Sequence, residues 1–152
     1  MKHFLILLTT VIFTYTFTIA QSTPEDSVKA AVNKLFEGMK SADPGLINNA
    51  FADSAILQTI ARNQSGQTII RTDKVSDFAE QIAKLPKGAA DERITFETVR
   101  IDGPLAIVWT PYKFYYNGNF SHCGVNSFQL VRINGTWKIQ YLIDTRRRQE
   151  CQ

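Results

Sequence analysis

Residues that build metal sites are scarce in this sequence, which has only two cysteines and two histidines among its 152 residues. His3 lies in an apolar N-terminal segment, so His122 is the one imidazole in the rest of the chain. A structural zinc site takes four cysteine or histidine ligands, and we therefore expect no metal. The sequence also has no glycine-rich phosphate loop and no nucleophile elbow, and we expect no cofactor.

A strong charge of either sign is also missing. Without Lys2 of the N-terminal segment, 16 basic residues (17 − 1) stand against 14 acidic ones, which gives a net charge of +2. Proteins that bind nucleic acid or anionic membranes through charge carry a much stronger basic bias. We therefore expect neither nucleic acid nor a membrane surface as a partner.

Only one long apolar run occurs, from Phe4 to Ile19, and it follows the positive charge of Lys2. With small residues at Thr18 and Ala20, this arrangement is typical of a secretory signal peptide. The run is about 16 residues long and contains five threonines, which is short and polar for a spanning helix. We predict cleavage after Ala20 and export to the periplasm or the medium. An uncleaved membrane anchor is the alternative.

Removal of a signal peptide at residues 1–20 leaves residues 21–152, a length that suits one domain with a single core. Both cysteines, Cys123 and Cys151, lie in this exported part and can form a disulfide in an oxidising compartment. Closing the loop between them would stabilise the fold by about 3.5 kcal/mol in the chain-entropy model. Two free, separately packed thiols remain the alternative.

The first half of the mature chain has helical patterns. Thr23-Pro24-Glu25-Asp26 combines a capping hydroxyl, a proline in the first turn and acids that favour a helix N-terminus. Apolar residues follow at helical spacing to about Ser41. The other elements predicted in this half are a short helix after Asp43-Pro44, a hairpin with strands at 55–62 and 68–71, and a third helix from Val75 to Leu85.

The second half has strand patterns separated by three two-residue turns, Asp102-Gly103, Asn117-Gly118 and Asn134-Gly135. Such dipeptides are the strongest local signal for a β-hairpin. They predict a four-stranded meander, and with the preceding helices they predict an α+β fold: a curved, barrel-like antiparallel sheet, including a short N-terminal hairpin, packed on about three helices. The strands of the meander are expected at 92–101, 104–116, 119–133 and 136–147.

The turns also predict which side chains share a face of the sheet. Two-residue loops would pair Ile133 with Thr136 and Tyr115 with Phe120, and Cys123 would then point away from the helices, toward Cys151. A β-bulge near Pro111 or Gly124 would shift these positions. The face expected to meet the helices has an apolar end, with Leu105, Ile107, Phe128, Leu130, Ile139 and Tyr141, and a polar end, with Lys113, His122, Asn126, Thr145 and Arg147.

This inner face supplies the candidate site residues. His122 is the candidate catalytic base, although no carboxylate is expected beside it and like charges would lower its pKa. Simple hydrogen bonding by His122, and plain core packing by the aromatic side chains, are the alternatives. The candidate ligand-binding residues are Trp109, Lys113, Asn126, Phe128, Tyr141 and Arg147.

Three segments carry a resemblance to a known superfamily: FADSAIL at 51–57, YKFYYNGNFSHCGVNSFQLV at 112–131 and WKIQYLIDTRR at 137–147. In this order, after an amphipathic helix, they resemble the nuclear transport factor 2-like superfamily, and within it the SnoaL-like and lumazine-binding-like exported bacterial proteins. The resemblance covers essentially the whole mature chain. It implies a cone-shaped α+β fold with a pocket between sheet and helices, and often a dimer through the outer sheet face.

The superfamily includes isomerases, dehydratases, epoxide hydrolases, cyclases and binding proteins, so the fold does not decide the function. The catalytic features of its enzymes are hardly visible here. The first helix offers Leu35 and Phe36 where the isomerases place a tyrosine, and Asp144 is predicted to point outward. No acid is therefore expected at the polar end of the inner face.

The leading hypothesis is an exported pocket protein, expected to be a homodimer, that binds a small, partly apolar molecule without clear catalytic machinery. Two alternatives stay open. One is a cofactor-independent isomerase, dehydratase or cyclase that uses His122. The other is a protein-interaction module with a vestigial pocket and an apolar outer patch around Val125, Ser127 and Leu142. The identity of the ligand is not readable from the sequence.

Overall fold

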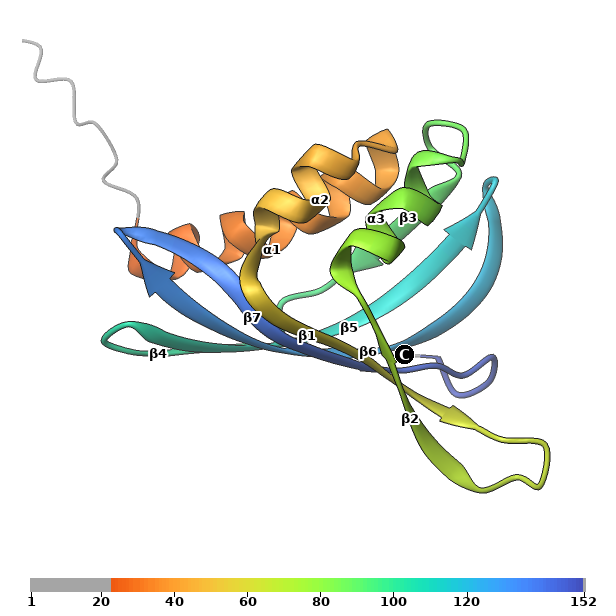
Figure 1. The fold of residues 1–152 in the computed structure, drawn as a ribbon. Coiled ribbons are helices and arrows are strands. Elements are labelled where there is room, and N and C mark those ends of the chain that lie inside the picture. The colour runs from red at the N-terminus through yellow and green to blue at the C-terminus, as the bar shows by residue number, and fades with distance from the viewer. Residues whose placement is uncertain (1–22, 152) are drawn as a thin grey trace, which may run out of the picture.

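The computed structural model describes residues 23–151, in which three helices cover one side of a curved sheet (Figure 1). The predicted signal peptide and its cleavage site at Ala20 lie outside these residues. None of the described helices is long and apolar enough to cross a membrane. The elements in chain order are α1 (Pro24–Ser41), α2 (Pro44–Ala50), β1 (Phe51–Arg62), β2 (Thr68–Asp73), α3 (Val75–Ala83), β3 (Ala90–Ile94), β4 (Thr98–Asp102), β5 (Leu105–Tyr116), β6 (Asn119–Ile133) and β7 (Thr136–Thr145).

Helix α1 begins at the capping signal that the sequence contains. The Asp26 amide donates a hydrogen bond to the Thr23 hydroxyl, and the Thr23 amide donates one to the Asp26 carboxylate in return. The buried stripe of the helix includes Val28, Val32 and Leu35. Residues at this spacing share one face of a helix, and here that face packs on the concave side of the sheet.

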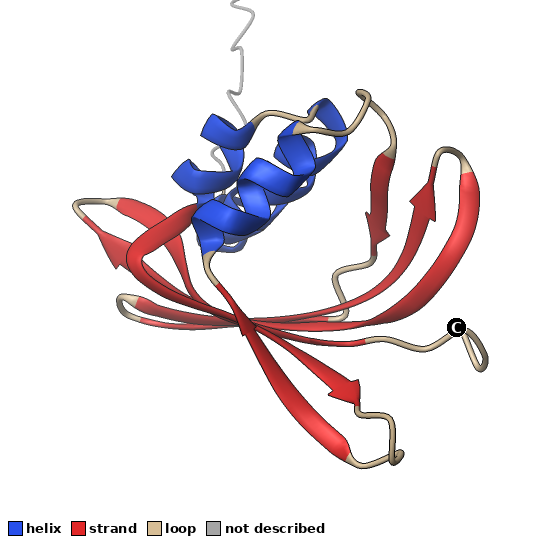
Figure 2. Cartoon of the chain, turned by 45° about the vertical axis from the view of Figure 1, so that its right-hand side comes forward, coloured by secondary structure: helices blue, strands red, loops and turns tan. Residues whose placement is uncertain are grey.

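The seven strands form one sheet in the order β2-β1-β7-β6-β5-β3, and β4 also pairs with β5. Strands β1 and β7 run parallel, and the other pairs are antiparallel. The expectation of a wholly antiparallel sheet was therefore wrong on this point. A parallel pair joins distant parts of the chain, and no local turn signals it. Figure 2 shows how the strands curve around the helices.

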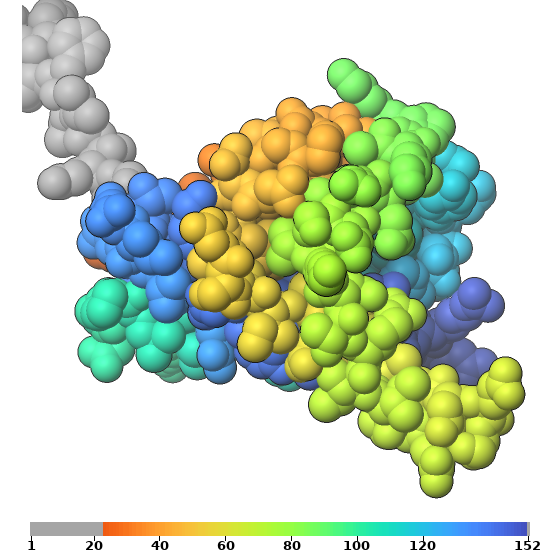
Figure 3. Space-filling model, in the orientation of Figure 1, coloured from red at the N-terminus to blue at the C-terminus, as the bar shows by residue number. Residues whose placement is uncertain are grey.

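The first predicted strand of the meander, 92–101, is two strands. Strand β3 pairs with the second half of β5, and β4 pairs with its first half. Between them Phe96 leaves the strand pattern and packs against the hydrophobic core. The hairpin of β1 and β2 projects beyond the body of the domain, at the lower right of Figure 3.

A β-bulge changes the register between β5 and β6. Near the turn the predicted pairing of Tyr115 with Phe120 is confirmed, but Ser121 is then an extra residue, and Thr110 lies opposite Asn126. Because a one-residue slip moves a side chain to the other face, all residues of β5 from Leu105 to Phe114 are reversed relative to the prediction. The β5 side chains that were expected to face the helices and instead lie on the outer face are Leu105, Ile107, Trp109 and Lys113.

A second bulge lies in β7 and reverses the faces of the residues that follow it. The predicted pairing of Ile133 with Thr136 is confirmed, but Gln140 is an extra residue, so that Asn126 lies opposite Asp144. Past the bulge, Tyr141, Ile143 and Arg147 turn to the outer face, contrary to the prediction. Leu142 and Asp144 are buried on the inner face instead, and the expected outer patch around Leu142 is therefore not formed.

The hydrophobic core lies between α1 and the middle of the sheet. Its fully buried members include Phe128, Leu130 and Ile139. The ring of Phe36 meets that of Phe128 edge to face, at 6.2 Å between centroids. Phe128 is thus a core residue, which was the alternative reading of the predicted aromatic wall.

Candidate ligand-binding site

A cavity of about 60 Å³ lies between α1, α3 and the inner face of the sheet. One part of its lining is apolar and the other part is polar and charged. The apolar lining consists of Leu35, Phe36, Met39, Leu57, Phe78 and Leu142. The polar lining consists of Thr59, Asp73, Glu92, Asn126, Asp144 and Arg146.

The Glu92 carboxyl group is the most perturbed acid of the cavity. It lies on β3, and its Oε1 accepts a hydrogen bond of 2.7 Å from the Asn126 amide nitrogen on β6. Burial raises the pKa of Glu92 to about 7, and the nearby Asp144 carboxylate adds to this effect. A carboxyl group with this pKa exchanges its proton near neutral pH, which an exposed glutamate does not do.

Asp144, which lies opposite Asn126 on the neighbouring strand, is the centre of a second polar group in the cavity. Its Oδ2 accepts hydrogen bonds from the Tyr112 hydroxyl at 3.2 Å and from Arg146 Nε at 2.9 Å. The same guanidinium donates to the Thr59 hydroxyl at 3.3 Å. Burial acts to lower the pKa of Arg146, but the Asp144 carboxylate outweighs it and raises that pKa, so Arg146 stays charged.

Tyr112 fixes the position of this group against the backbone. Its hydroxyl lies 2.9 Å from the Thr145 carbonyl oxygen, and burial, with the neighbouring carboxylates, strongly raises its pKa. The hydroxyl is therefore a permanent donor at neutral pH. Across from it Gly124 leaves the space that the Thr145 carbonyl and the Tyr112 ring occupy, because a side chain there would overlap both.

His122, the predicted base, is on the inner face but does not line the cavity. Its ring packs against Phe114 at 5.0 Å and Tyr112 at 5.7 Å between centroids, and its Nδ1 lies 3.1 Å from the Ser121 hydroxyl. Burial lowers the pKa of His122, and the positive charge of Arg146 lowers it further. The expected neighbour Lys113 is on the other face of the sheet.

Of the six predicted ligand-binding residues, Asn126 lines the cavity. Trp109, which is 45% exposed, and Lys113 lie on the outer face because of the bulge in β6. Tyr141 also lies outside, where its hydroxyl donates to Gln58 at 2.7 Å. Arg147 donates to the Glu150 carbonyl at 3.2 Å, remote from the cavity.

The sequence did not lead us to expect Glu92, Asp144 and Arg146 in the lining of the cavity, or Tyr112, whose hydroxyl bonds to Asp144. Their inward positions depend on the two bulges and on the separate strand β3. The alternation Asp144-Thr145-Arg146 placed both charged residues on one face, which was a usable signal. It was assigned to the wrong face because the extra residue at Gln140 was not anticipated.

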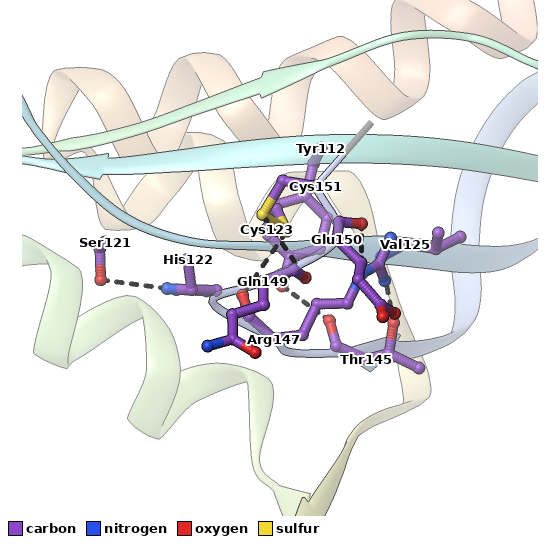
Figure 4. Close-up of a disulfide and its surroundings, with 10 residues drawn as sticks. All are labelled: Tyr112, Ser121, His122, Cys123, Val125, Thr145, Arg147, Gln149, Glu150 and Cys151. Carbon is purple, nitrogen blue, oxygen red and sulfur yellow. Dashed lines mark hydrogen bonds between the residues drawn. A yellow bond between two sulfur atoms is a disulfide. The ribbon is translucent and has the colours of Figure 1, made fainter.

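The predicted disulfide between Cys123 and Cys151 is present, with 5.8 Å between the two Cα atoms. Figure 4 shows Cys123 on β6 joined to the tail that follows β7. Backbone hydrogen bonds of 2.8 Å run in both directions between Cys123 and Arg147. The disulfide and these hydrogen bonds therefore hold the tail along β6, just past the residues that line the cavity.

The outer surface has two further features. Leu105, Ile107 and Trp109 are each 45% exposed on neighbouring outward positions of β5. A wide, open hollow of about 630 Å³ lies beside the β5–β6 turn, next to Phe120 and Arg148. Its open shape and few charged groups make it a weaker ligand site than the cavity. Within residues 23–151 no group of three or more histidine, cysteine or acidic side chains is arranged to hold a metal ion.

Known structures share this architecture. A nuclear transport factor 2-like protein of unknown function from Shewanella baltica is similar with a TM-score of 0.64 and 15% identity, over 80% of this chain and 91% of that one. A domain of unknown function with a cystatin-like fold from Nostoc punctiforme has a TM-score of 0.64 and 15% identity, over 84% and 80%. At such identities the likeness shows the fold alone, and the chain has a nuclear transport factor 2-like fold.

The sequence itself matches a family model over residues 23–141. The chain belongs to this family, whose description is "Putative lumazine-binding". A comparison with curated protein sequences gives no significant match.

Proposed function

We propose that the protein is an exported binding protein for a small, partly apolar molecule that occupies the cavity between α1, α3 and the sheet. The observation that carries the proposal is the two-part lining of this cavity. Apolar side chains such as Phe36 and Met39 meet the buried Asp144 and the partly buried Glu92, carboxyl groups that the hydrophobic core does not require. Burying charged groups is costly, so an arrangement of this kind is typical of a site.

The family and the N-terminal sequence support two parts of this proposal. The family description names lumazine as a ligand, which supports a small-molecule site. A bicyclic ring of that size is larger than the 60 Å³ cavity, so it would enter only if the helices moved. The apolar N-terminal segment and the disulfide between Cys123 and Cys151 support export to an oxidising compartment.

The test is native mass spectrometry of the mature protein purified from its own host. We expect an N-terminus at Gln21, an oxidised disulfide and a bound small molecule. In Asn126→Leu the bound molecule should be lost, while Asn119→Leu, an exposed change on the same strand, should retain it. A protein that is empty from the host would argue against the binding role.

The second candidate is a cofactor-independent enzyme with Glu92, and not His122, as its acid–base group. The observation that favours it is the pKa of about 7 for a carboxyl group inside the cavity, which suits proton transfer at neutral pH. Proton abstraction next to a carbonyl would appear as deuterium uptake at that carbon in a panel of cyclic ketones. Uptake that persists in Glu92→Gln would rule out this role for Glu92.

A homodimer through the outer sheet face remains part of the proposal. The exposed side chains of Leu105, Ile107 and Trp109 support it, because adjacent large apolar groups on an outer face favour association. They also fit the third hypothesis, a protein-interaction module. A stable dimer of the purified chain would favour the homodimer over the protein-interaction module.

A further inference from the structure

The hydrogen-bond donors of the cavity are largely directed at protein acceptors. The Tyr112 hydroxyl faces Asp144 and the Thr145 carbonyl, and Asn126 Nδ2 donates to Glu92 Oε1. Arg146 donates through Nε and Nη2 to protein oxygens. Its side chain is 47% exposed, so its remaining N–H groups lie at the rim, where water can satisfy them.

Several hydrogen-bond acceptors of the cavity, in contrast, have no protein donor. Asp144 is 7% exposed and Asn126 is 4% exposed, and both line the cavity. Among the described residues, no protein donor reaches Asp144 Oδ1 or Asn126 Oδ1 within hydrogen-bond distance. Glu92 Oε2 is likewise without a protein donor in residues 23–151. Three acceptor oxygens are therefore available to a ligand. In residues 23–151, Thr110 Oγ1 is the one fully buried side-chain polar atom without a partner, so these three oxygens can reach water, which a ligand would displace.

The charge of the cavity lining also favours a ligand that donates hydrogen bonds. Its lining has the three acids Asp73, Glu92 and Asp144 against the single base Arg146. With all three acids ionised, the lining has a net charge of −2. Asp73 is paired with Arg71, just outside the lining, at 3.4 Å, so the negative excess inside the cavity depends on the ionised form of Glu92. An anionic ligand would therefore meet an unfavourable field, and a cationic one a favourable field.

We propose that the ligand presents a compact nitrogen cation, an amidinium or a protonated amine, to the free oxygens of Asp144, Asn126 and Glu92. A small apolar part, such as the methyl group of acetamidine, lies against Phe36 and Met39. This inference rests on the proposed binding function and names the chemical class of the ligand. A cavity of about 60 Å³ has room for roughly two water molecules, which is the size of such a head group and not of a whole drug-like molecule.

Ionisation of Glu92 couples this binding to pH. The groups that face or approach its carboxyl group are Asn126 on β6, Asp144 and Arg146 on β7, and Tyr112 on β5, with apolar side chains from α1 and α3. A bound cation stabilises the ionised form. We therefore expect the affinity for a cation to increase about tenfold between pH 5.5 and pH 8, since a hydrogen bond to a charged group is stronger than one to a neutral group.

The test uses probes that differ only in the head group: acetamidine, acetamide and acetate, and the larger benzamidine, benzamide and benzoate. Binding to the mature, oxidised protein is followed by NMR titration of the Asn126 side-chain amide and the backbone amides around the cavity. At pH 8 we expect each amidine to bind roughly tenfold more tightly than its amide, and the carboxylates to bind most weakly.

Two variants and a control locate the effect. Glu92→Gln should remove the pH dependence of amidine binding, and Asp144→Asn should remove the preference for amidines over amides. Glu97→Gln changes an exposed acid just outside β3 and should behave like the unchanged protein. If Asp144→Asn does not fold, the pH dependence of amidine binding in Glu92→Gln still tests the proposed ligand class.

The results distinguish a wrong ligand class from a wrong binding function. If amides or carboxylates bind at the cavity as tightly as amidines, the ligand class is wrong and the binding function stands. An affinity for amidines with the same pH dependence in Glu92→Gln also overturns the inference. If none of the six probes perturbs the cavity, both the inference and the proposed function are wrong.

Discussion

Replacing Glu92 by glutamine should change how the stability of the fold depends on pH. Its pKa is raised from 4.5 to about 7, so between these values the folded state binds more protons than the unfolded state. The stability contributed by protonated Glu92 is thus complete below pH 4.5 and is lost as the pH rises through 7. A shift of this size corresponds to about 3 kcal/mol. Glutamine keeps an oxygen for Asn126 but does not ionise.

We therefore expect Glu92→Gln to be as stable as the unchanged protein near pH 4.5 and about 3 kcal/mol more stable at pH 8. This corresponds to a difference in Tm of roughly 10 °C for a domain of this size. The measurement is chemical denaturation of both proteins from pH 4.5 to pH 8.5. His122, whose pKa is lowered, gives stability that is lost as the pH falls, but this effect is common to both proteins and cancels.

An exposed acid provides the control. Glu97→Gln should leave the pH profile unchanged, because Glu97 is in contact with solvent. If Glu92→Gln gives a profile parallel to that of the unchanged protein, then Glu92 is ionised in the folded state at the usual pH. The cavity would in that case be well hydrated, and the assignment of a neutral acid to it would be wrong.

Three further predictions concern the frame around the cavity. Gly124→Ala should destabilise the fold by about 3 kcal/mol, since its methyl group would overlap a backbone carbonyl and the ring of Tyr112; an unchanged urea midpoint would contradict this. Cys151→Ser should lower the free energy of unfolding by up to about 3.5 kcal/mol, measured by chemical denaturation. Reduction of the disulfide in the unchanged protein should lower it by the same amount. Trp109→Lys should convert a dimer into a monomer in light scattering after gel filtration, with little change in Tm, whereas a monomeric unchanged protein would refute the outer-face dimer.

The sequence predicted most of the elements because their signals are local. The capping box at Thr23, the helical spacing to Ser41 and the three glycine turns each involve a few consecutive residues. The pairing of β1 with β7 and the break at Phe96 have no such signals. They depend on contacts between distant parts of the chain, which a single sequence does not reveal.

The site was harder to predict than the fold because it depends on register. A turn fixes the pairing next to it, and Tyr115 with Phe120 confirms this. Each bulge then reverses the faces beyond it, which is why Trp109 and Lys113 were assigned to the wrong side. A bulge was anticipated near Pro111 or Gly124, but the extra residues are Ser121 and Gln140.

The two bulges have a common consequence for the cavity. The bulge in β7 turns Asp144 to the inner face, and the bulge in β6 brings Tyr112 of β5 to the same face, where its hydroxyl meets that carboxylate. With only one of the two bulges the pair would lie on opposite faces of the sheet, and with neither bulge both side chains would lie on the outer face. Just past this point the disulfide holds the tail along β6. The same two bulges also turn Ala106, Val108 and Leu142 into the hydrophobic core. The bulges therefore set both the core packing and the polar lining of the cavity.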